Sequence, residues 1–286
     1  MTTRADFHFF ERLRVRWAEV DLQKIVFNGH YLMYFDTAVA GYWRAMALPY
    51  EQTLAYLGGD LFVRKSTVEY EASAAYDDLI DVGVRTARIG NSSLVLGCAV
   101  FRGDQLLVTG ELVYVYADPA TKTSLPVPQQ LRDALNAFEA GKPMVDVRVG
   151  AWDELGREAG PIRQQVFVEE QGIPAEMEWD AADAVAVHAV AYNRFGAPLA
   201  TGRLLEHVPG VAKIGRMAVL APMRGSRVGR AVLDALMAAA RARGDREVLL
   251  HAQVSAAPFY ARAGFTPRGP QFDEAGIPHI EMVRVL

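Results

Sequence analysis

The sequence predicts an α+β protein of two domains, and three observations lead to that prediction. The chain has 286 residues, and domains typically run about 100–200 residues, so its length fits two of them. Its first half places one long amphipathic helix ahead of several strand-like segments, whereas its second half mixes strands and helices. Between them, Gly141-Lys142-Pro143 ends a helix, which divides the chain into domains over 1–143 and 144–286.

Composition excludes several classes of protein. With 51% hydrophobic residues the chain has ample apolar surface to bury, which excludes intrinsic disorder. Its single cysteine, Cys98, excludes a disulfide framework and a multi-cysteine metal site, and fits a reducing compartment. No apolar run approaches the roughly 18–20 residues of a membrane span, and the N-terminus lacks the apolar stretch of a signal peptide. We therefore expect a cytoplasmic protein without a membrane partner.

The charge balance argues against a nucleic-acid partner, because the formal net charge is −4. Fifteen of the sixteen basic residues after residue 143 are nevertheless arginine, which binds phosphate and carboxylate groups in a forked geometry. Four of them fall within fifteen residues: Arg216, Arg224, Arg227 and Arg230. This clustering indicates either an anion site or a solvated helix face.

The first half is expected to wrap an antiparallel sheet around one buried helix. In chain order we expect a strand over 7–18, a helix over 30–48, strands over 61–75, 80–89, 94–101 and 105–117, and a helix over 127–140. Apolar residues recur at helical spacing along the first helix, namely Tyr31, Phe35, Ala38, Tyr42 and Met46. So wide an apolar face needs burial on more than one side, which the surrounding strands provide.

Asp21 is the candidate catalytic residue of this half. It precedes the short apolar turn Ile25-Val26-Phe27, which leads into the long helix. A carboxylate there faces the unpaired amides at the helix N-terminus, which can polarise a thioester carbonyl while Asp21 attacks or activates water. The alternative is an ordinary turn or capping residue.

The segment Asp21-Leu-Gln-Lys-Ile-Val-Phe-Asn-Gly-His-Tyr31 resembles the D-x-x-G-x-V-x-x-x-x-Y signature of hotdog-fold acyl-CoA thioesterases. These are of the 4-hydroxybenzoyl-CoA thioesterase type, particularly the YbgC/FadM-like branch, and the resemblance covers roughly residues 7–135. It implies a hotdog fold, with Asp21 as nucleophile or general base and the backbone amide of Asn28 as an oxyanion contact. It also implies a homodimer or homotetramer whose interface holds the pantetheine arm. Lys24 stands where the family has glycine.

The second half centres on a strand, a loop and a helix over 213–243. In chain order we expect a strand over 145–150, a short helix over 153–159, a helix over 161–171 that begins at its proline, strands over 185–192, 197–206 and 213–220, a helix over 226–243, a strand over 247–253 and a helix over 257–263. Small residues Gly225 and Ser226 let a ligand approach the backbone, and the amides at the helix start favour an anion such as pyrophosphate. The alternative is a tight turn that carries surface arginines.

The loop Arg224-Gly-Ser-Arg227-Val-Gly229 resembles motif A, R/Q-x-x-G-x-G/A, of the GNAT-superfamily N-acetyltransferases. Further segments resemble the ElaA-like branch in the same order: 162–171, 216–219, 251–253, 258–265 and 276–282. The resemblance covers roughly residues 146–286 and implies a mixed sheet flanked by helices. It also implies acetyl-CoA or CoA as co-substrate and an amine on a small molecule or a protein as acceptor. Arg227 stands at the middle glycine of the family motif.

The same resemblance implies the site residues. The expected CoA contacts are Arg224, Gly225, Ser226, Arg227, Val228 and Gly229, with Ala218 and Val219 on the preceding strand. Tyr260 stands where the family places a general acid for the departing CoA thiolate. His251, His279 and Glu281 are candidates for a proton relay or for substrate contacts, with structural hydrogen bonds as the alternative. No pair of His has the spacing of zinc ligands, so we expect no metal.

Three functions are compatible with these patterns. The first, which we expect, is a bifunctional enzyme that hydrolyses acyl-CoA in the N-terminal domain and transfers an acyl group from CoA to an amine in the C-terminal domain. The second is an active acetyltransferase whose hotdog domain only dimerises or senses acyl-CoA, as Lys24 would suggest. The third is a non-catalytic CoA-binding scaffold, as Arg227 would suggest.

Overall fold

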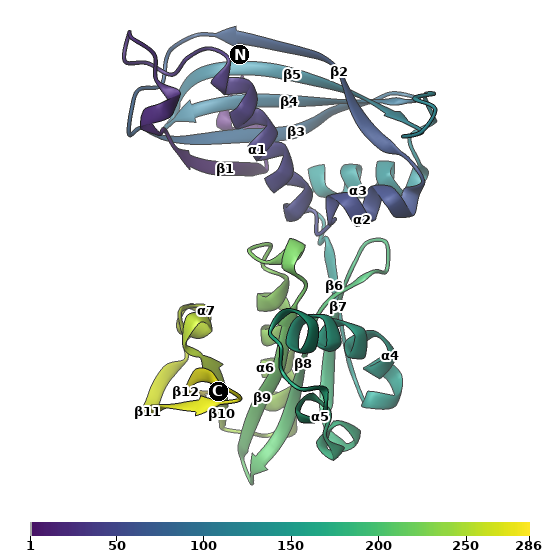
Figure 1. The fold of residues 1–286 in the computed structure, drawn as a ribbon, viewed down its shortest axis with the longest axis vertical. Coiled ribbons are helices and arrows are strands. Elements are labelled where there is room, and N and C mark those ends of the chain that lie inside the picture. The colour runs from purple at the N-terminus through teal and green to yellow at the C-terminus, as the bar shows by residue number, and fades with distance from the viewer. Residues whose placement is uncertain (1) are drawn as a thin grey trace. The chain divides into compact units, whose positions relative to one another are not determined.

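The computed structural model describes residues 2–286 and divides the chain into two compact units, Met1–Met144 and Val145–Leu286. This division lies one residue beyond the expected one. Figure 1 labels the elements of both units, coloured from purple at the N-terminus to yellow at the C-terminus. Within residues 2–286, no helix combines the length and the apolar character that crossing a lipid bilayer requires.

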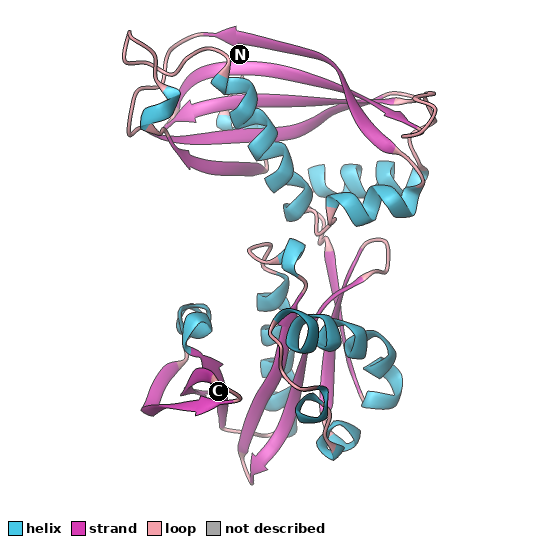
Figure 2. Cartoon of the chain, in the orientation of Figure 1, coloured by secondary structure: helices cyan, strands magenta, loops and turns pink. Residues whose placement is uncertain are grey.

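The N-terminal unit is a five-stranded antiparallel sheet curved around a long helix, as Figure 2 shows. The sheet order is β1-β3-β4-β5-β2, with β1 Phe9–Arg14, β2 Asp60–Tyr70, β3 Leu79–Ile89, β4 Ser93–Arg102 and β5 Gln105–Ala117. The helices are α1 His30–Ala45, α2 Tyr50–Leu57 and α3 Gln129–Glu139. The predicted hotdog arrangement, an antiparallel sheet wrapped around a long helix, is confirmed.

The long helix α1 lies close against the sheet because one of the two residues that meet at these contact points is a glycine. A Cβ atom on Gly110 of β5 would lie 2.5 Å from the ring of Phe35, and one on Gly41 of α1 would lie 2.9 Å from the ring of Phe9. Phe35 and Tyr42 are completely buried as a result. Burying such large aromatic side chains is a main source of stabilisation for this unit.

Some element boundaries of the N-terminal unit differ from the prediction. The first strand is shorter than 7–18, because Trp17–Glu19 form a 3-10 turn instead. The second strand ends at Tyr70 rather than at residue 75. Helix α2 was not predicted, since its eight residues are too few for a helical period to stand out.

The C-terminal unit is a seven-stranded mixed sheet in the order β11-β12-β10-β9-β8-β7-β6. The strands are β6 Val145–Gly150, β7 Val187–Asn193, β8 Pro198–Val208, β9 Val211–Val219, β10 Glu247–Gln253, β11 Thr266–Glu274 and β12 Ile277–Val285. Only β9 and β10 pair in parallel, and the other neighbours are antiparallel. The helices are α4 Trp152–Arg163, α5 Ala175–Glu178, α6 Val228–Arg243 and α7 Ala257–Arg262. The predicted mixed sheet flanked by helices is confirmed.

Strand β8 shows that α4 and α6 cover opposite faces of this sheet. A Cβ atom on Gly202 would meet side chains of α6, the nearest being Leu236 at 2.8 Å. Its neighbour Arg203 points to the other face, where it shares a carboxylate with Arg163 of α4. Successive side chains of a strand alternate between the two faces, so the strand is sandwiched between the helices.

The predicted helix start at Pro161 is wrong. Helix α4 begins at Trp152, contains Pro161 in its interior and continues into a π-helical segment over Gln164–Glu170. Proline inside a helix costs about 3 kcal/mol. The buried face that Ala159, Ile162 and Val166 present to the core continues across the proline. Tertiary packing therefore overrides the local helix-breaking signal.

Candidate active sites

Asp21 closes a tight turn in the N-terminal unit. Its amide donates to the carbonyl of Ile25 at 2.9 Å, and its own carbonyl accepts the amide of Lys24 at 2.9 Å. The side-chain oxygen Oδ1 accepts the amide of Gln23 at 2.7 Å. Within residues 2–286 no donor reaches Oδ2 of this half-buried carboxylate. Asp21 therefore has the capping role of the alternative interpretation and still keeps one oxygen for chemistry.

Lys24 adopts the backbone conformation of the glycine that it replaces. Its φ angle is +64°, in the left-handed region that costs an L-residue about 1–2 kcal/mol. The loop thus follows a glycine-like path although the side chain is lysine. The substitution alone gives no reason to expect that Asp21 is misplaced.

Asn28 lies between this turn and α1, which begins after Gly29 as N-cap. The Asn28 carbonyl accepts the Tyr70 hydroxyl at 3.2 Å, while its amide donates no hydrogen bond within residues 2–286. Large apolar side chains on these segments are strongly exposed, Leu22 at 103% and Phe27 at 51%. The turn therefore offers a free carboxylate oxygen and a free amide on a surface that is apolar and open.

Glu19 is a second carboxylate near this turn, and the sequence analysis did not single it out. It is buried and accepts the Tyr34 hydroxyl at 2.6 Å and the Arg16 amide at 2.7 Å. Burial raises its pKa, but these hydrogen bonds outweigh burial and leave the pKa below its ordinary value. Its carbonyl also accepts the Phe27 amide. Glu19 is thus engaged in holding the loop to α1.

In the C-terminal unit the parallel strands β9 and β10 separate at their carboxyl ends. Their pairing runs from Val211 with Glu247 to Ile214 with Leu250 and goes no further. Just beyond, Arg216 has a φ angle of +51°, and the β8–β9 register shifts at the same place. The opening between the separated ends borders two cavities.

The first cavity, which we call the CoA cavity after the ligand that the sequence resemblance implies, has a volume of about 850 Å³. Its lining includes five of the eight residues expected to contact CoA, namely Val219, Arg224, Gly225, Arg227 and Gly229. The other three, Ala218, Ser226 and Val228, do not line it. Ala218 and Val228 are each 1% exposed, and the Ser226 hydroxyl donates to the Met223 carbonyl. Ala218 on β9 and Val228 on α6 point into the core, and Ser226 is engaged within the turn before α6.

Gly229 has a packing role in this loop. A Cβ atom there would lie 2.9 Å from a methyl group of Val219 on β9. Without a side chain at this position, the first turn of α6 lies directly against the strand. Its amides, which have no intrahelical acceptors, can then point at an anion in the CoA cavity.

The arginines of the loop differ in how they are engaged. The Arg224 guanidinium donates to both carboxylate oxygens of Glu170, each at 2.6 Å, and to the Val219 carbonyl at 3.2 Å. Arg230 is paired with Asp234 on its own helix. The exposed Arg227 makes no ion pair or hydrogen bond through its side chain within residues 2–286. Arg227 is therefore the loop cation available to a phosphate without breaking another contact.

Arg227 is the N-cap of α6 with a φ angle of +68°. Replacing it with glycine is expected to leave the free energy of unfolding unchanged or raise it by up to about 1 kcal/mol, because glycine relieves the strain but has more backbone entropy to lose. The same change is expected to weaken CoA binding by about threefold to tenfold, since the unpaired cation is lost. Denaturant titration and calorimetry with CoA measure the two effects.

The matched control is Arg241→Gly, an exposed position in the last turn of the same helix. It is expected to lose stability and to keep its CoA affinity. Tighter CoA binding by the Arg227→Gly variant would instead mean that the arginine side chain obstructs the site.

The second cavity, which we call the acceptor cavity, has a volume of about 410 Å³. It meets the CoA cavity at shared lining residues: Gln171, Met217, Gln253, Ala256 and Tyr260. Tyr260 is 8% exposed, and burial raises its pKa to about 12. Its hydroxyl has no hydrogen-bond partner within residues 2–286. A protonated, unpartnered O–H group therefore stands where the two cavities join.

Two of the three candidate relay residues line the acceptor cavity. His279 on β12 pairs with Gln253 on β10, and His251 lies two residues earlier on the same face. Nδ1 of His279 lies 2.8 Å from the Ile277 carbonyl. A carbonyl can only accept, so Nδ1 carries the proton and Nε2 of the neutral ring keeps a lone pair.

Glu281 stands apart from the cavities. It does not line either of them, and it forms an ion pair of 2.6 Å with Arg268 on β11. That ion pair holds its pKa below the ordinary value. Glu281 also lies 3.8 Å from Nε2 of His251, so it acts on the cavity only through that histidine.

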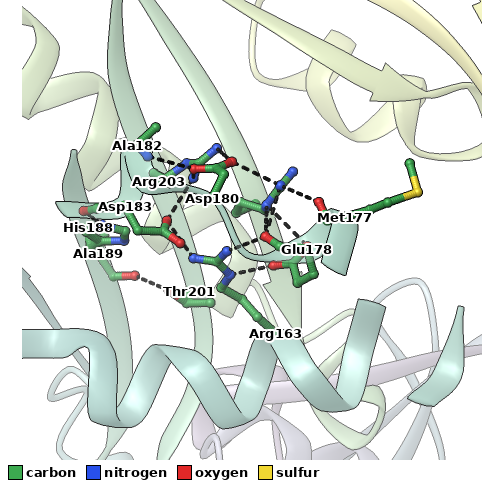
Figure 3. A network of polar contacts seen from close by, with 11 residues as sticks. Arg163, Met177, Glu178, Asp180, Ala182, Asp183, His188, Ala189, Thr201 and Arg203 are labelled. Atoms are coloured by element: carbon green, nitrogen blue, oxygen red, sulfur yellow. Dashed lines mark hydrogen bonds and ion pairs between the residues drawn. The ribbon is translucent and has the colours of Figure 1, made fainter. Parts of the chain in front are cut away.

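Figure 3 shows a largely buried ion network. Four of its residues line the acceptor cavity, namely Glu178, Asp180, Arg203 and Arg216. Arg163 is 1% exposed and donates to Glu178 at 2.5 Å and to Asp183 at 2.8 Å. Arg203 donates to Asp183 and to Asp180. Arg216 contacts Glu178 and Asp180. The network fastens the segment 175–185 to the sheet, and no local pattern in the sequence indicates it.

Within residues 2–286 no group of three or more His, Cys, Asp or Glu side chains is arranged to hold a metal ion. The functional groups that the structure brings together are a tyrosine, two histidines and several arginines. They can donate and accept protons and bind anions.

Comparison with known proteins matches each of the two units to a known family. Residues 160–286 match the acetyltransferase (GNAT) domain family, and residues 23–109 match the thioesterase superfamily. The chain is 35% identical over 133 residues to YjcF, an uncharacterised N-acetyltransferase of Bacillus subtilis, covering 46% of this chain and 94% of that one. It is 33% identical over 132 residues to the uncharacterised protein YyaT of the same organism, covering 45% and 88%.

Among solved structures, the chain is similar to a 1,4-dihydroxy-2-naphthoyl-CoA thioesterase from Synechocystis. The sequence identity is 17% and the TM-score 0.42, covering 46% of this chain and 97% of that one. It is also similar to the PA5185 protein of Pseudomonas aeruginosa, with 31% identity and a TM-score of 0.41, covering 49% and 98%.

Proposed function

The chain belongs to the GNAT acetyltransferases through its C-terminal unit and to the thioesterase superfamily through its N-terminal unit, and from this we propose a bifunctional enzyme of CoA thioesters. The C-terminal unit transfers an acetyl group from acetyl-CoA to an amine. The N-terminal unit hydrolyses an acyl-CoA to a carboxylic acid and CoA. The observation that carries the first activity is the protonated Tyr260 at the junction of the CoA and acceptor cavities.

Acetyl transfer follows from the position of these groups. The amine enters the acceptor cavity and its nitrogen attacks the thioester carbon at the junction, where the two reactants are held together. The new C–N bond forms as the C–S bond breaks, and the thiolate takes the proton of the Tyr260 hydroxyl. Nε2 of His279 accepts the proton that the attacking nitrogen loses. Phenol and imidazole are restored when the phenolate regains a proton and the imidazolium loses one to solvent.

The CoA cavity supports this assignment on the cofactor side. The first-turn amides of α6 and the unpaired Arg227 suit the pyrophosphate. The separated ends of β9 and β10 leave backbone groups unpaired, and these can hydrogen-bond to the amides of the pantetheine arm.

For the N-terminal unit, the free oxygen of Asp21 and the free amide of Asn28 support thioester hydrolysis. Asp21 attacks the acyl carbon or activates the water that does, while the amide stabilises the oxyanion. The exposed apolar side chains around the turn suit burial by a second copy of this chain. We therefore propose that the site is completed in a homodimer.

Replacing Asp21 with asparagine is expected to lower amine-independent thiol release from acyl-CoA by about 100-fold or more. Asparagine still accepts the Gln23 amide, so the turn is preserved. Amine-dependent release by the C-terminal unit should be unchanged. A thiol-detecting assay over a panel of acyl-CoA chain lengths, with and without amines, measures both rates.

Asp104→Asn, in the exposed turn between β4 and β5, is the matched control and should leave both rates unchanged. If Asp21→Asn retains full amine-independent release, hydrolysis does not depend on this site. The hotdog unit would then serve for dimerisation or acyl-CoA sensing. Light scattering of the purified protein tests the dimer separately.

A further inference from the structure

The charges that line the acceptor cavity do not cancel completely. The buried ion network contains three arginines and three carboxylates: Arg163, Arg203, Arg216, Glu178, Asp180 and Asp183. Every carboxylate in it contacts at least one arginine. The network is therefore neutral as a whole, and the remaining charges of the cavity determine what it attracts.

Lys213 of β9 is the cation that remains. It is the single lysine after residue 143, it is partly buried, and it lines the acceptor cavity. Its ammonium lies 3.4 Å from Nδ1 of His251, and no carboxylate lies within 4.0 Å of it in residues 2–286. An ammonium group in a cavity without a counter-ion attracts an anion.

A second donor in this wall is also unused. Arg203 is 6% exposed and lines the acceptor cavity, and its Nε atom is buried without any acceptor in residues 2–286. A buried N–H group without a partner costs about 1–3 kcal/mol. Because the Nε atom itself is buried, a ligand in the cavity does not reach it, and the unmet donor remains a cost within the network.

Glu274 is the one carboxylate of the cavity outside the network. It lies 3.4 Å from Nδ1 of His251, and its side chain is 52% exposed at the end of β11. Solvent screens so exposed a charge. At the rim it suits the approach of a cationic amine, and it does not neutralise Lys213.

From these contacts we infer that the acceptor is an amine that also carries a carboxylate, and that Lys213 binds this carboxylate. The inference rests on the proposed acetyl transfer. Lys213 and Met217, which lines both cavities, are four residues apart on β9, at most roughly 13 Å because the strand is irregular at Arg216 between them. Such a separation favours an amine at the far end of the molecule, as in an ω-amino acid, over an α-amino acid.

The test uses the full chain with acetyl-CoA and pairs of acceptors that differ only in charge. The pairs are 3-aminopropionate, 4-aminobutyrate and 6-aminohexanoate, each against its carboxamide, and glycine against glycinamide. We expect kcat/KM to be about tenfold or more higher for the ω-amino acids than for their amides. Lys213→Met is expected to abolish that preference by lowering kcat/KM for the acids, while the amides change less than about twofold.

Arg241→Met, at an exposed position on α6, is the control and should retain the preference. Unchanged CoA affinity of Lys213→Met shows that the variant is folded. Equal use of acids and amides by the wild-type protein, or a preference that survives Lys213→Met, overturns this inference and leaves the acetyltransferase proposal standing. Failure to acetylate any amine of the panel, with CoA still bound, contradicts both.

Discussion

Replacing Arg163 with methionine is expected to lower the free energy of unfolding of the C-terminal unit by about 3–5 kcal/mol. The side chain is 1% exposed and donates three hydrogen bonds, to both the carboxylate and the carbonyl of Glu178 and to Asp183. Methionine fills much of the volume but leaves Glu178 without its closest cation and Asp183 with only Arg203. Removing one partner of a buried ion network is costly because the other charges remain buried.

Urea denaturation of the full chain, followed by tryptophan fluorescence, measures this effect. Trp152 and Trp179 both lie against the Arg163 guanidinium, at 5.3 and 4.7 Å, so they report on the affected unit. Arg157→Met on the exposed face of α4 is the matched control and should change stability by less than about 0.5 kcal/mol.

The triple variant Arg163→Met, Glu178→Gln, Asp183→Asn should regain part of the lost free energy of unfolding. In it, the two carboxylates that lost their arginine partner are replaced by neutral amides. If Arg163→Met alone lowers the free energy of unfolding by less than about 1 kcal/mol, this account of the network is contradicted. Burying the Glu178 and Asp183 carboxylates without Arg163 would then hardly be unfavourable.

Asp183 of this network contributes a pH dependence of definite sign to stability. Burial raises the pKa of Asp183, but hydrogen bonds from Arg163 and Arg203 outweigh burial and hold the pKa below its ordinary value. A carboxyl group of this kind stabilises the fold above its unfolded pKa of about 3.9. That contribution is lost as the pH falls through the lower, folded value. In Arg163→Met the acid-induced loss is expected to begin at a higher pH.

Replacing Tyr260 with phenylalanine is expected to lower kcat for acetyl transfer by about 100-fold to 1,000-fold. The variant keeps the ring, which packs edge-on against Phe259 and Phe265, so CoA affinity should change little. Because burial raises the pKa of Tyr260 to about 12, the phenol stays protonated through the neutral and moderately alkaline range. The defect should therefore be the same throughout that range.

Tyr192→Phe, a buried tyrosine of the same unit that lines neither cavity, is the matched control. His279→Asn gives a contrasting signature. Its defect should shrink as the pH rises, because solvent hydroxide can then accept the proton that the attacking nitrogen loses. Unchanged kcat in Tyr260→Phe would mean that another group protonates the departing thiolate.

Local patterns are what the sequence predicted well. The apolar period of α1 and the start of α6 near its glycine-containing loop each depend on residues close together in the chain. The N-terminal sheet was predicted from these patterns and the mixed C-terminal sheet from the resemblance to a known fold, and both are confirmed. Pro161 shows the limit, because its local signal for a helix start was outweighed by packing that involves distant strands.

The ion network and the pairing of Arg224 were beyond sequence analysis. Arg163 and Arg203 are forty residues apart, and charged residues in a sequence ordinarily indicate an exposed surface. Likewise, Arg224 and Glu170 lie 54 positions apart, so nothing local indicates that this arginine is already paired. Ion pairs between residues so far apart in the chain can be identified only from the folded structure.

Lys24 and Arg227 together change how such loops are to be recognised. Each stands where its family has glycine, and each keeps a positive φ angle, +64° and +68°. What both loops retain is therefore a torsion angle, although the residue type that usually marks it is gone. A search that requires the letter G would discard both halves of this chain, whereas one that requires a left-handed residue would find both. Lysine and arginine then bring to the loop a charge that glycine has no means to provide.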